Sequence, residues 1–100
     1  MMAIYPNAHM ETLFYDDSPA YENHPCTVKL NGPDITVEYE GGEGDLVYYK
    51  GQERGDGHYE LASNEVNGKA TLHRFKDSKV LEGFWIESGA RGMWRIRLED

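Results

Sequence analysis

Residues 92–98 read Gly-Met-Trp-Arg-Ile-Arg-Leu, in which apolar and polar residues alternate from Trp94 onward. Two earlier stretches repeat this pattern after a glycine: residues 57–61 read Gly-His-Tyr-Glu-Leu, and residues 68–72 read Gly-Lys-Ala-Thr-Leu. Successive side chains of a strand point to opposite faces, so this alternation is typical of half-buried antiparallel strands. The second half of the chain therefore predicts a sheet with one face in the core.

Turn-forming clusters recur from residue 27 onward at the spacing of about 8–12 residues that is typical of sandwiches and barrels. They divide the chain into seven expected strands, at residues 27–30, 35–40, 46–52, 58–62, 69–75, 80–87 and 93–98. Short turns make consecutive strands antiparallel neighbours. We expect an all-β fold, in which a seven- to eight-stranded antiparallel meander forms a small closed or nearly closed barrel. The interior of an eight-stranded barrel is filled by side chains or holds one small ligand, and strands this short favour a packed interior.

Residues 1–26 differ from the rest of the chain, because they hold three of the four prolines and the polar stretch 16–18. Within them, residues 10–15 read Met-Glu-Thr-Leu-Phe-Tyr and could form an eighth strand. We therefore expect an N-terminal arm over residues 1–26 with a possible strand at 10–15, followed by a β-barrel domain over residues 27–100.

The composition limits the classes of partner. The 100 residues are enough for one domain, and 18 acidic against 10 basic residues give a net charge of −8. Such a surface repels phosphate backbones, so we expect no nucleic-acid partner. The chain has one cysteine, no secretory signal pattern and no apolar run of the length, about 18 residues, that a membrane span needs. We expect a cytoplasmic protein with no membrane partner.

Two expected strands are apolar on both faces, at residues 46–49 and 80–86. A strand of this kind needs cover on both sides. Residues 13–15 of the arm could lie on the outer face, and so could a second copy of the chain. Both explanations stay open, and the second would make the protein a homodimer.

Glycine stands two residues before tryptophan twice, in Gly83-Phe84-Trp85 and in Gly92-Met93-Trp94. This element resembles the Gly-x-Trp element of lipocalin-like and avidin-like small barrels, although here it lies near the C-terminus. The resemblance implies a compact antiparallel barrel with aromatic residues near a mouth, and small-ligand binding. It transfers no family site residue to this chain.

Aromatic side chains supply the candidate binding site. Tyr39, Tyr59 and Trp94 fall on the inward phase of their strands, and Trp85 and one of the pair Tyr48 and Tyr49 could join them. Such rings are the usual lining of a small-molecule pocket, but they also fill the cores of small β-proteins. The expected ligand-binding residues are Tyr39, Tyr48, Tyr59, Arg74, Trp85 and Trp94.

Arginine side chains could act in two ways. Arg74 points inward at one end of the barrel if it keeps phase with Leu72, and it would then need a carboxylate or a bound anion as a partner. Arg95 and Arg97 share the strand face opposite Trp94. We expect them to pair with Glu82 or Glu87 on the adjoining strand, or to bind a carboxylate ligand.

The sequence offers little for catalysis or for metal binding. The four histidines are scattered, and no cysteine pair accompanies them, so we expect no metal site. Cys26 near His24 is the nucleophile–base candidate, and no cofactor fingerprint is present. We expect a non-enzymatic binding domain that holds a small apolar or anionic ligand at an aromatic-lined barrel mouth, without a cofactor. The alternative is an acidic protein-interaction module or homodimer without a small-molecule ligand.

Overall fold

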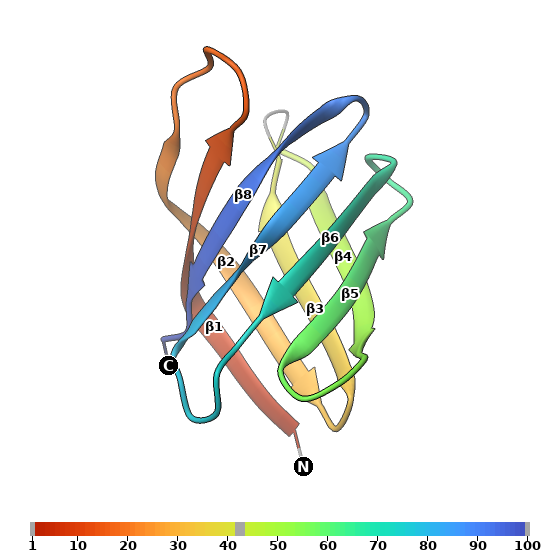
Figure 1. The fold of residues 1–100 in the computed structure, drawn as a ribbon. Coiled ribbons are helices and arrows are strands. Elements are labelled where there is room, and N and C mark those ends of the chain that lie inside the picture. Colours follow the sequence, from red (N-terminus) through yellow and green to blue (C-terminus); the bar gives the residue numbers. More distant parts are fainter. Residues whose placement is uncertain (1, 42–43, 100) are drawn as a thin grey trace.

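The computed structural model describes residues 2–41 and 44–99, which form a closed barrel of antiparallel strands (Figure 1). The strands are β1 (Met2–Phe14), β2 (Tyr21–Asn31), β3 (Asp34–Glu40), β4 (Leu46–Glu53), β5 (His58–Ser63), β6 (Gly68–His73), β7 (Val80–Glu87) and β8 (Ala90–Arg97). Within these described ranges there is no helix, and so none that is long and apolar enough to cross a membrane.

The topology is the predicted meander, because each strand pairs with the next one along the chain. Pairing between β1 and β8 closes the barrel, with Met10 opposite Ile96 and Leu13 opposite Met93. The inward phase that follows each glycine is also confirmed, since Trp94 and the equivalent residues of β5 and β6 are buried. The all-β fold expected from alternation is therefore the fold of the chain.

The N-terminal segment contributes more to the barrel than an arm with one short strand. β1 occupies residues 2–14 and pairs with both β2 and β8. Two prolines are compatible with these strands because they lie at positions where a backbone N–H is not needed for pairing. Pro6 falls at a register shift between Tyr5 and Ala8, and Pro25 precedes the first pair of β2 with β3, at Cys26. A residue without an N–H is tolerated at a bulge or where a strand has one paired neighbour.

The two ends of the barrel differ in what fills them. The β1–β2, β5–β6 and β7–β8 connections lie together with the end of β3 and the start of β4 at one end, drawn uppermost in Figure 1, which we call the mouth end. The other end holds the N-terminus and the three remaining hairpin turns. Aliphatic side chains fill the interior toward that end, among them Val28, Ile35, Leu72, Leu81 and Ile96, all at most 1% exposed. Aromatic side chains predominate toward the mouth end.

The outer face of β7 is partly covered by the segment that follows β1. The ring of Tyr15 lies 6.1 Å from that of Phe84, centroid to centroid, whereas Phe14 turns inward onto Trp85. Leu13 and Leu46 remain about half exposed, at 54% and 51%. The N-terminal segment therefore covers one of the two strands with apolar outer faces, and only in part.

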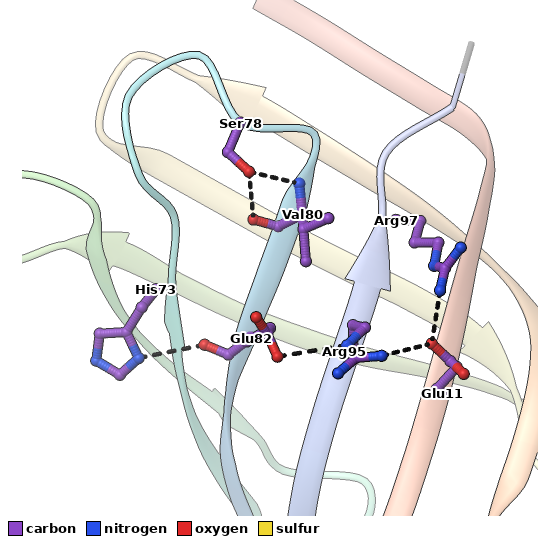
Figure 2. Close-up of polar contacts among 7 residues, drawn as sticks. All are labelled: Glu11, His73, Ser78, Val80, Glu82, Arg95 and Arg97. Carbon is purple, nitrogen blue, oxygen red and sulfur yellow. Dashed lines mark hydrogen bonds and ion pairs between the residues drawn. The ribbon is translucent and has the colours of Figure 1, made fainter.

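Charged side chains cross the outer face of β7, β8 and β1 as a ladder (Figure 2). Arg95 Nε donates to Glu82 Oε2 at 3.3 Å, which confirms the first of the two pairings expected for it. On the other side, Arg95 Nη1 and Arg97 Nη2 lie 3.7 and 3.6 Å from Glu11 Oε1. Arg95 is about half exposed, so such pairs contribute about 0.2–1 kcal/mol each. Glu87 takes no part in this ladder and turns into the barrel instead.

Candidate functional site

An open cavity of about 690 Å³ lies at the mouth end of the barrel, and we call it the mouth cavity. Its lining residues are Met10, Thr12, Phe14, Tyr21, Glu22, His24, Pro25, Tyr39, Glu40, Gly41, Val47, Val66, Trp85, Glu87 and Trp94. The volume lies within the range of about 300–1,000 Å³ that is usual for small-molecule sites. The interior is therefore packed in one half and hollow in the other, rather than packed throughout as the strand lengths suggested.

A continuous network of rings forms the wall of the mouth cavity. Trp85 and Trp94 stack with centroids 6.2 Å apart, and Phe14 meets Trp85 edge to face at 5.3 Å. Behind this wall lies the fully buried ring of Tyr49, which meets Trp94 edge to face at 4.9 Å and lies 6.4 Å from Tyr39. Edge-to-face and offset contacts are the favourable geometries for aromatic pairs. Each ring is thus held by another ring, which fixes the shape of the wall.

Glu87 supplies a carboxylate inside this aromatic wall. The hydroxyl of Tyr49 donates to Glu87 Oε1 at 2.7 Å, and that of Tyr39 donates to the same oxygen at 3.4 Å. Burial, reinforced by the neighbouring carboxylate, raises the pKa of both phenols well above the usual range. Both hydroxyls therefore stay protonated at neutral pH and act as hydrogen-bond donors.

Trp85 adds a polar atom with no partner. The side chain is 3% exposed, and its Nε1 has no hydrogen bond to any described residue. A buried donor left unpaired costs about 1–3 kcal/mol, so such groups are uncommon in folded proteins. Trp85 lines the mouth cavity with its ring, but its Nε1 has almost no accessible surface, so this donor is not exposed to the open space.

A bulge in β2 turns side chains toward the cavity. Between the pairs Met10–His24 and Thr12–Tyr21, β1 advances by two residues and β2 by three. Asn23 absorbs the extra residue with a φ of 56°, a left-handed conformation that asparagine tolerates better than most residues. As a result Tyr21 and His24, which a regular strand would place on opposite faces, both line the cavity.

Two glycines make room for the aromatic wall. A Cβ atom on Gly68 would clash with the phenol of Tyr49, and one on Gly92 would clash with the Trp85 ring and with the backbone of β1. Gly92 pairs with Phe14 on one side and with Trp85 on the other, and those two rings meet beside it. Both glycines were predicted as strand openers, and the structure adds their second role.

The structure brings together three of the six residues expected to bind a ligand. Tyr39, Trp85 and Trp94 line the mouth cavity. Tyr48 points outward, with Lys50 Nζ 5.6 Å from its ring, whereas its neighbour Tyr49 points inward.

Tyr59 and Arg74 lie at the opposite end of the barrel, beside the β4–β5 and β6–β7 turns. There Arg74 Nε donates to the Ser78 carbonyl at 2.6 Å. The structure therefore does not place Arg74 where it could hold an anion bound in the mouth cavity.

Sequence reasoning missed Glu87 as a site residue. It falls two residues after Trp85 and therefore shares the inward phase of β7, and this was the available signal. Because an acidic residue beside a turn is ordinarily exposed to solvent, the sequence did not indicate that Glu87 lines the cavity.

The catalytic candidate does not form an active pair. Cys26 is buried, which raises the pKa of its thiol to about 12, so the thiol stays protonated at neutral pH. His24 Nε2 donates to the Glu40 carbonyl at 2.9 Å. Over residues 2–41 and 44–99, no three metal-ligating side chains form a cluster that could hold a metal ion.

No protein-family model, no curated protein and no solved structure matches this chain. The resemblance to lipocalin-like and avidin-like barrels therefore rests on the two Gly-x-Trp elements and stays a prediction.

Proposed function

We propose that this barrel is a non-enzymatic binding domain that holds one small, largely apolar molecule in the mouth cavity. The cavity itself is the observation that carries the proposal, because its volume of about 690 Å³ and its aromatic wall match the usual properties of small-molecule sites. One polar group of the lining, the Glu87 carboxylate, would orient the molecule.

The rings serve as more than core filling. In the half of the barrel near the N-terminus, aliphatic side chains pack the interior. Toward the mouth end the rings surround open space, and Tyr39 stays only partly buried there. A wall that is rigid, apolar and only partly covered is the arrangement that favours binding of an apolar ligand.

A neutral apolar probe, N-phenyl-1-naphthylamine, tests the proposal. Its emission should rise on binding, and the emission of Trp85 and Trp94, the two tryptophans of the chain, should fall. Replacing Tyr39 with alanine should weaken probe binding by about tenfold, since an aromatic contact is worth about 1 kcal/mol or more.

Tyr48→Ala on the outer face is the matched control and should leave probe binding unchanged. Equal loss in both variants, or no binding to the native protein, would contradict the proposal. Native mass spectrometry of the protein purified gently from its own host would then show whether a small molecule is carried at all.

The exposed apolar side chains outside the barrel support a second candidate, association with another copy of the chain. Leu13, Tyr15 and Phe84 are 54%, 56% and 36% exposed and lie near one another across β1, β8 and β7. Sedimentation velocity over a range of protein concentrations separates the two candidates. A monomer at every concentration would remove the homodimer and leave ligand binding untouched.

A further inference from the structure

We propose that the molecule held in the mouth cavity is an organic cation, in which an apolar body carries a protonated amine or a quaternary ammonium group next to Glu87. This inference rests on the proposed function and specifies the class of its ligand. It replaces the anionic ligand that Arg74 would have served, because Arg74 lies at the other end of the barrel.

The charge around the cavity has one sign. Glu22, Glu40 and Glu87 line it, and the described lining includes no lysine or arginine. His24, the remaining titratable base there, uses Nε2 to bond the Glu40 carbonyl. The chain as a whole adds a net charge of −8. Both the local and the overall field therefore attract a cation and repel an anion.

Glu87 lacks a counter-charge. Two phenols donate to its Oε1, but the described part of the chain provides no ion pair to Glu87 and no hydrogen bond to its Oε2. Its Oε1 faces the two phenols, and the side chain as a whole is only partly exposed. Carboxylates in partly buried, apolar surroundings are ordinarily paired with a cation. A bound ammonium group would supply the pair that the protein itself omits.

The aromatic wall suits the same group. The rings of Tyr39 and Trp94 both line the cavity, 6.1 Å apart centroid to centroid, and the hydroxyl of Tyr39 donates to Glu87. The faces of tyrosine and tryptophan attract cations, and aromatic side chains are a common means of binding quaternary ammonium groups. This attraction adds to the charge of Glu87 rather than competing with it.

Three soluble probes of similar size but different charge test the inference: 2-phenylethylamine as the cation, 2-phenylethanol as the neutral molecule and phenylacetate as the anion. Binding is followed through the indole N–H signals in nitrogen-15 correlation spectra, with Trp85 assigned through Trp85→Phe. We expect the cation to bind about tenfold more tightly than the alcohol, and the anion to bind most weakly.

Glu87→Gln removes the charge but keeps an oxygen that can accept from both phenols. This variant should lower the affinity for 2-phenylethylamine by about tenfold and leave 2-phenylethanol unchanged. Asp56→Asn removes an equal charge from an exposed turn at the far end of the barrel, and it should change neither affinity. If Glu87→Gln fails to fold, Glu22→Gln at the exposed rim of the cavity should still lower the affinity for 2-phenylethylamine and leave the affinity for 2-phenylethanol unchanged.

The outcomes separate the inference from the function on which it rests. If the alcohol or the anion binds as tightly as the cation, the inference is wrong and the binding function stands. If Glu87→Gln and Asp56→Asn lower the affinity for 2-phenylethylamine equally, Glu87 is not the counter-charge, and the inference is again wrong. If none of the three probes binds, the proposed function fails together with the inference.

Discussion

Tyr49 joins the packed half of the barrel to the mouth cavity. Its side chain is fully buried, yet its hydroxyl reaches Glu87 Oε1 at 2.7 Å. Gly68 makes this possible, because any larger residue there would occupy the position of the phenol. A polar group buried this deeply needs its hydrogen bond, so the phenol and the carboxylate depend on each other.

Removing this hydroxyl tests that dependence. Tyr49→Phe keeps the ring but leaves Glu87 with the longer bond from Tyr39, at 3.4 Å. We expect the free energy of unfolding to fall by about 1–2 kcal/mol, since hydrogen bonds to charged groups contribute about 1.5–3 kcal/mol and Glu87 is only partly buried. Urea unfolding, followed by tryptophan fluorescence, measures the change.

The neighbouring tyrosine provides the control for this measurement. Tyr48→Phe alters the outer face of β4, where a single substitution changes stability by less than about 0.5 kcal/mol. An equal effect of the two substitutions would show that the Tyr49–Glu87 bond contributes nothing of its own.

Residue by residue, alternation predicted which side chains point inward but not at which end of the barrel they lie. Tyr39, Tyr59 and Trp94 all have the predicted inward phase, yet Tyr59 lies at the start of β5, away from the other two. Tyr49 could not be chosen over Tyr48, because both faces of β4 are apolar there. The position of a residue along the barrel axis depends on how many residues separate it from the ends of its strand. Local patterns do not fix those strand ends.

At the scale of elements, the pairing of β1 with β8 turns a sheet into a barrel. The sequence predicted β3 to β8 and residues 27–30 of β2, because their turns are short and their alternation is regular, but it assigned the first residues of β2 to the arm. It predicted β1 only as residues 10–15, since prolines such as Pro6 and Pro25 are more common in loops than in strands. Closure depends on contacts between residues 78 to 88 positions apart in the chain, and no local pattern reports them.

A substitution at Gly92 tests the pairing of β1 with β8, which we call the seam of the barrel. Gly92 lies in β8 between Phe14 of β1 and Trp85 of β7, and a Cβ atom there would clash with the Leu13 carbonyl and with the Trp85 ring. In the interior of a strand, replacing glycine with alanine is normally stabilising. Here we expect Gly92→Ala to lower the free energy of unfolding by about 1–3 kcal/mol, because the added methyl group overpacks the site. Urea unfolding measures the loss, and hydrogen exchange in β1 should accelerate.

Arg91→Ala is the matched control, because Arg91 is the exposed neighbour of Gly92 in the same strand. It should change stability by less than about 0.5 kcal/mol. A neutral or stabilising Gly92→Ala substitution would mean that β1 shifts without cost and that the seam is looser than the contacts of Gly92 imply.

At the scale of the whole molecule, the barrel divides its interior between stability and binding. The aliphatic half buries large side chains completely, while the aromatic half keeps an open cavity and an indole N–H that has no partner among the described residues. Cavities and unpaired donors lower stability, so proteins retain them where function requires them. A net charge of −8 on 100 residues adds self-repulsion to the same compact state.

The interior also predicts how stability changes in alkali. Burial raises the pKa of Cys26 to about 12 and raises the pKa values of Tyr39, Tyr49 and Tyr59. In the unfolded chain these groups lose their protons from about pH 8.5 for cysteine and about pH 10 for tyrosine. Above those values the unfolded state binds fewer protons than the folded state, so the free energy of unfolding must fall as the pH rises.

We therefore expect stability to be level up to about pH 8.5 and then to fall by several kcal/mol by about pH 11, as measured by urea unfolding at each pH. Cys26→Ala should delay the onset of this fall toward about pH 10, where the tyrosines take over. Part of the tyrosinate absorbance at 295 nm should appear only as the barrel unfolds. If stability were unchanged to about pH 11, the buried groups would ionise in the folded barrel, and water would have to reach the phenols that hold Glu87.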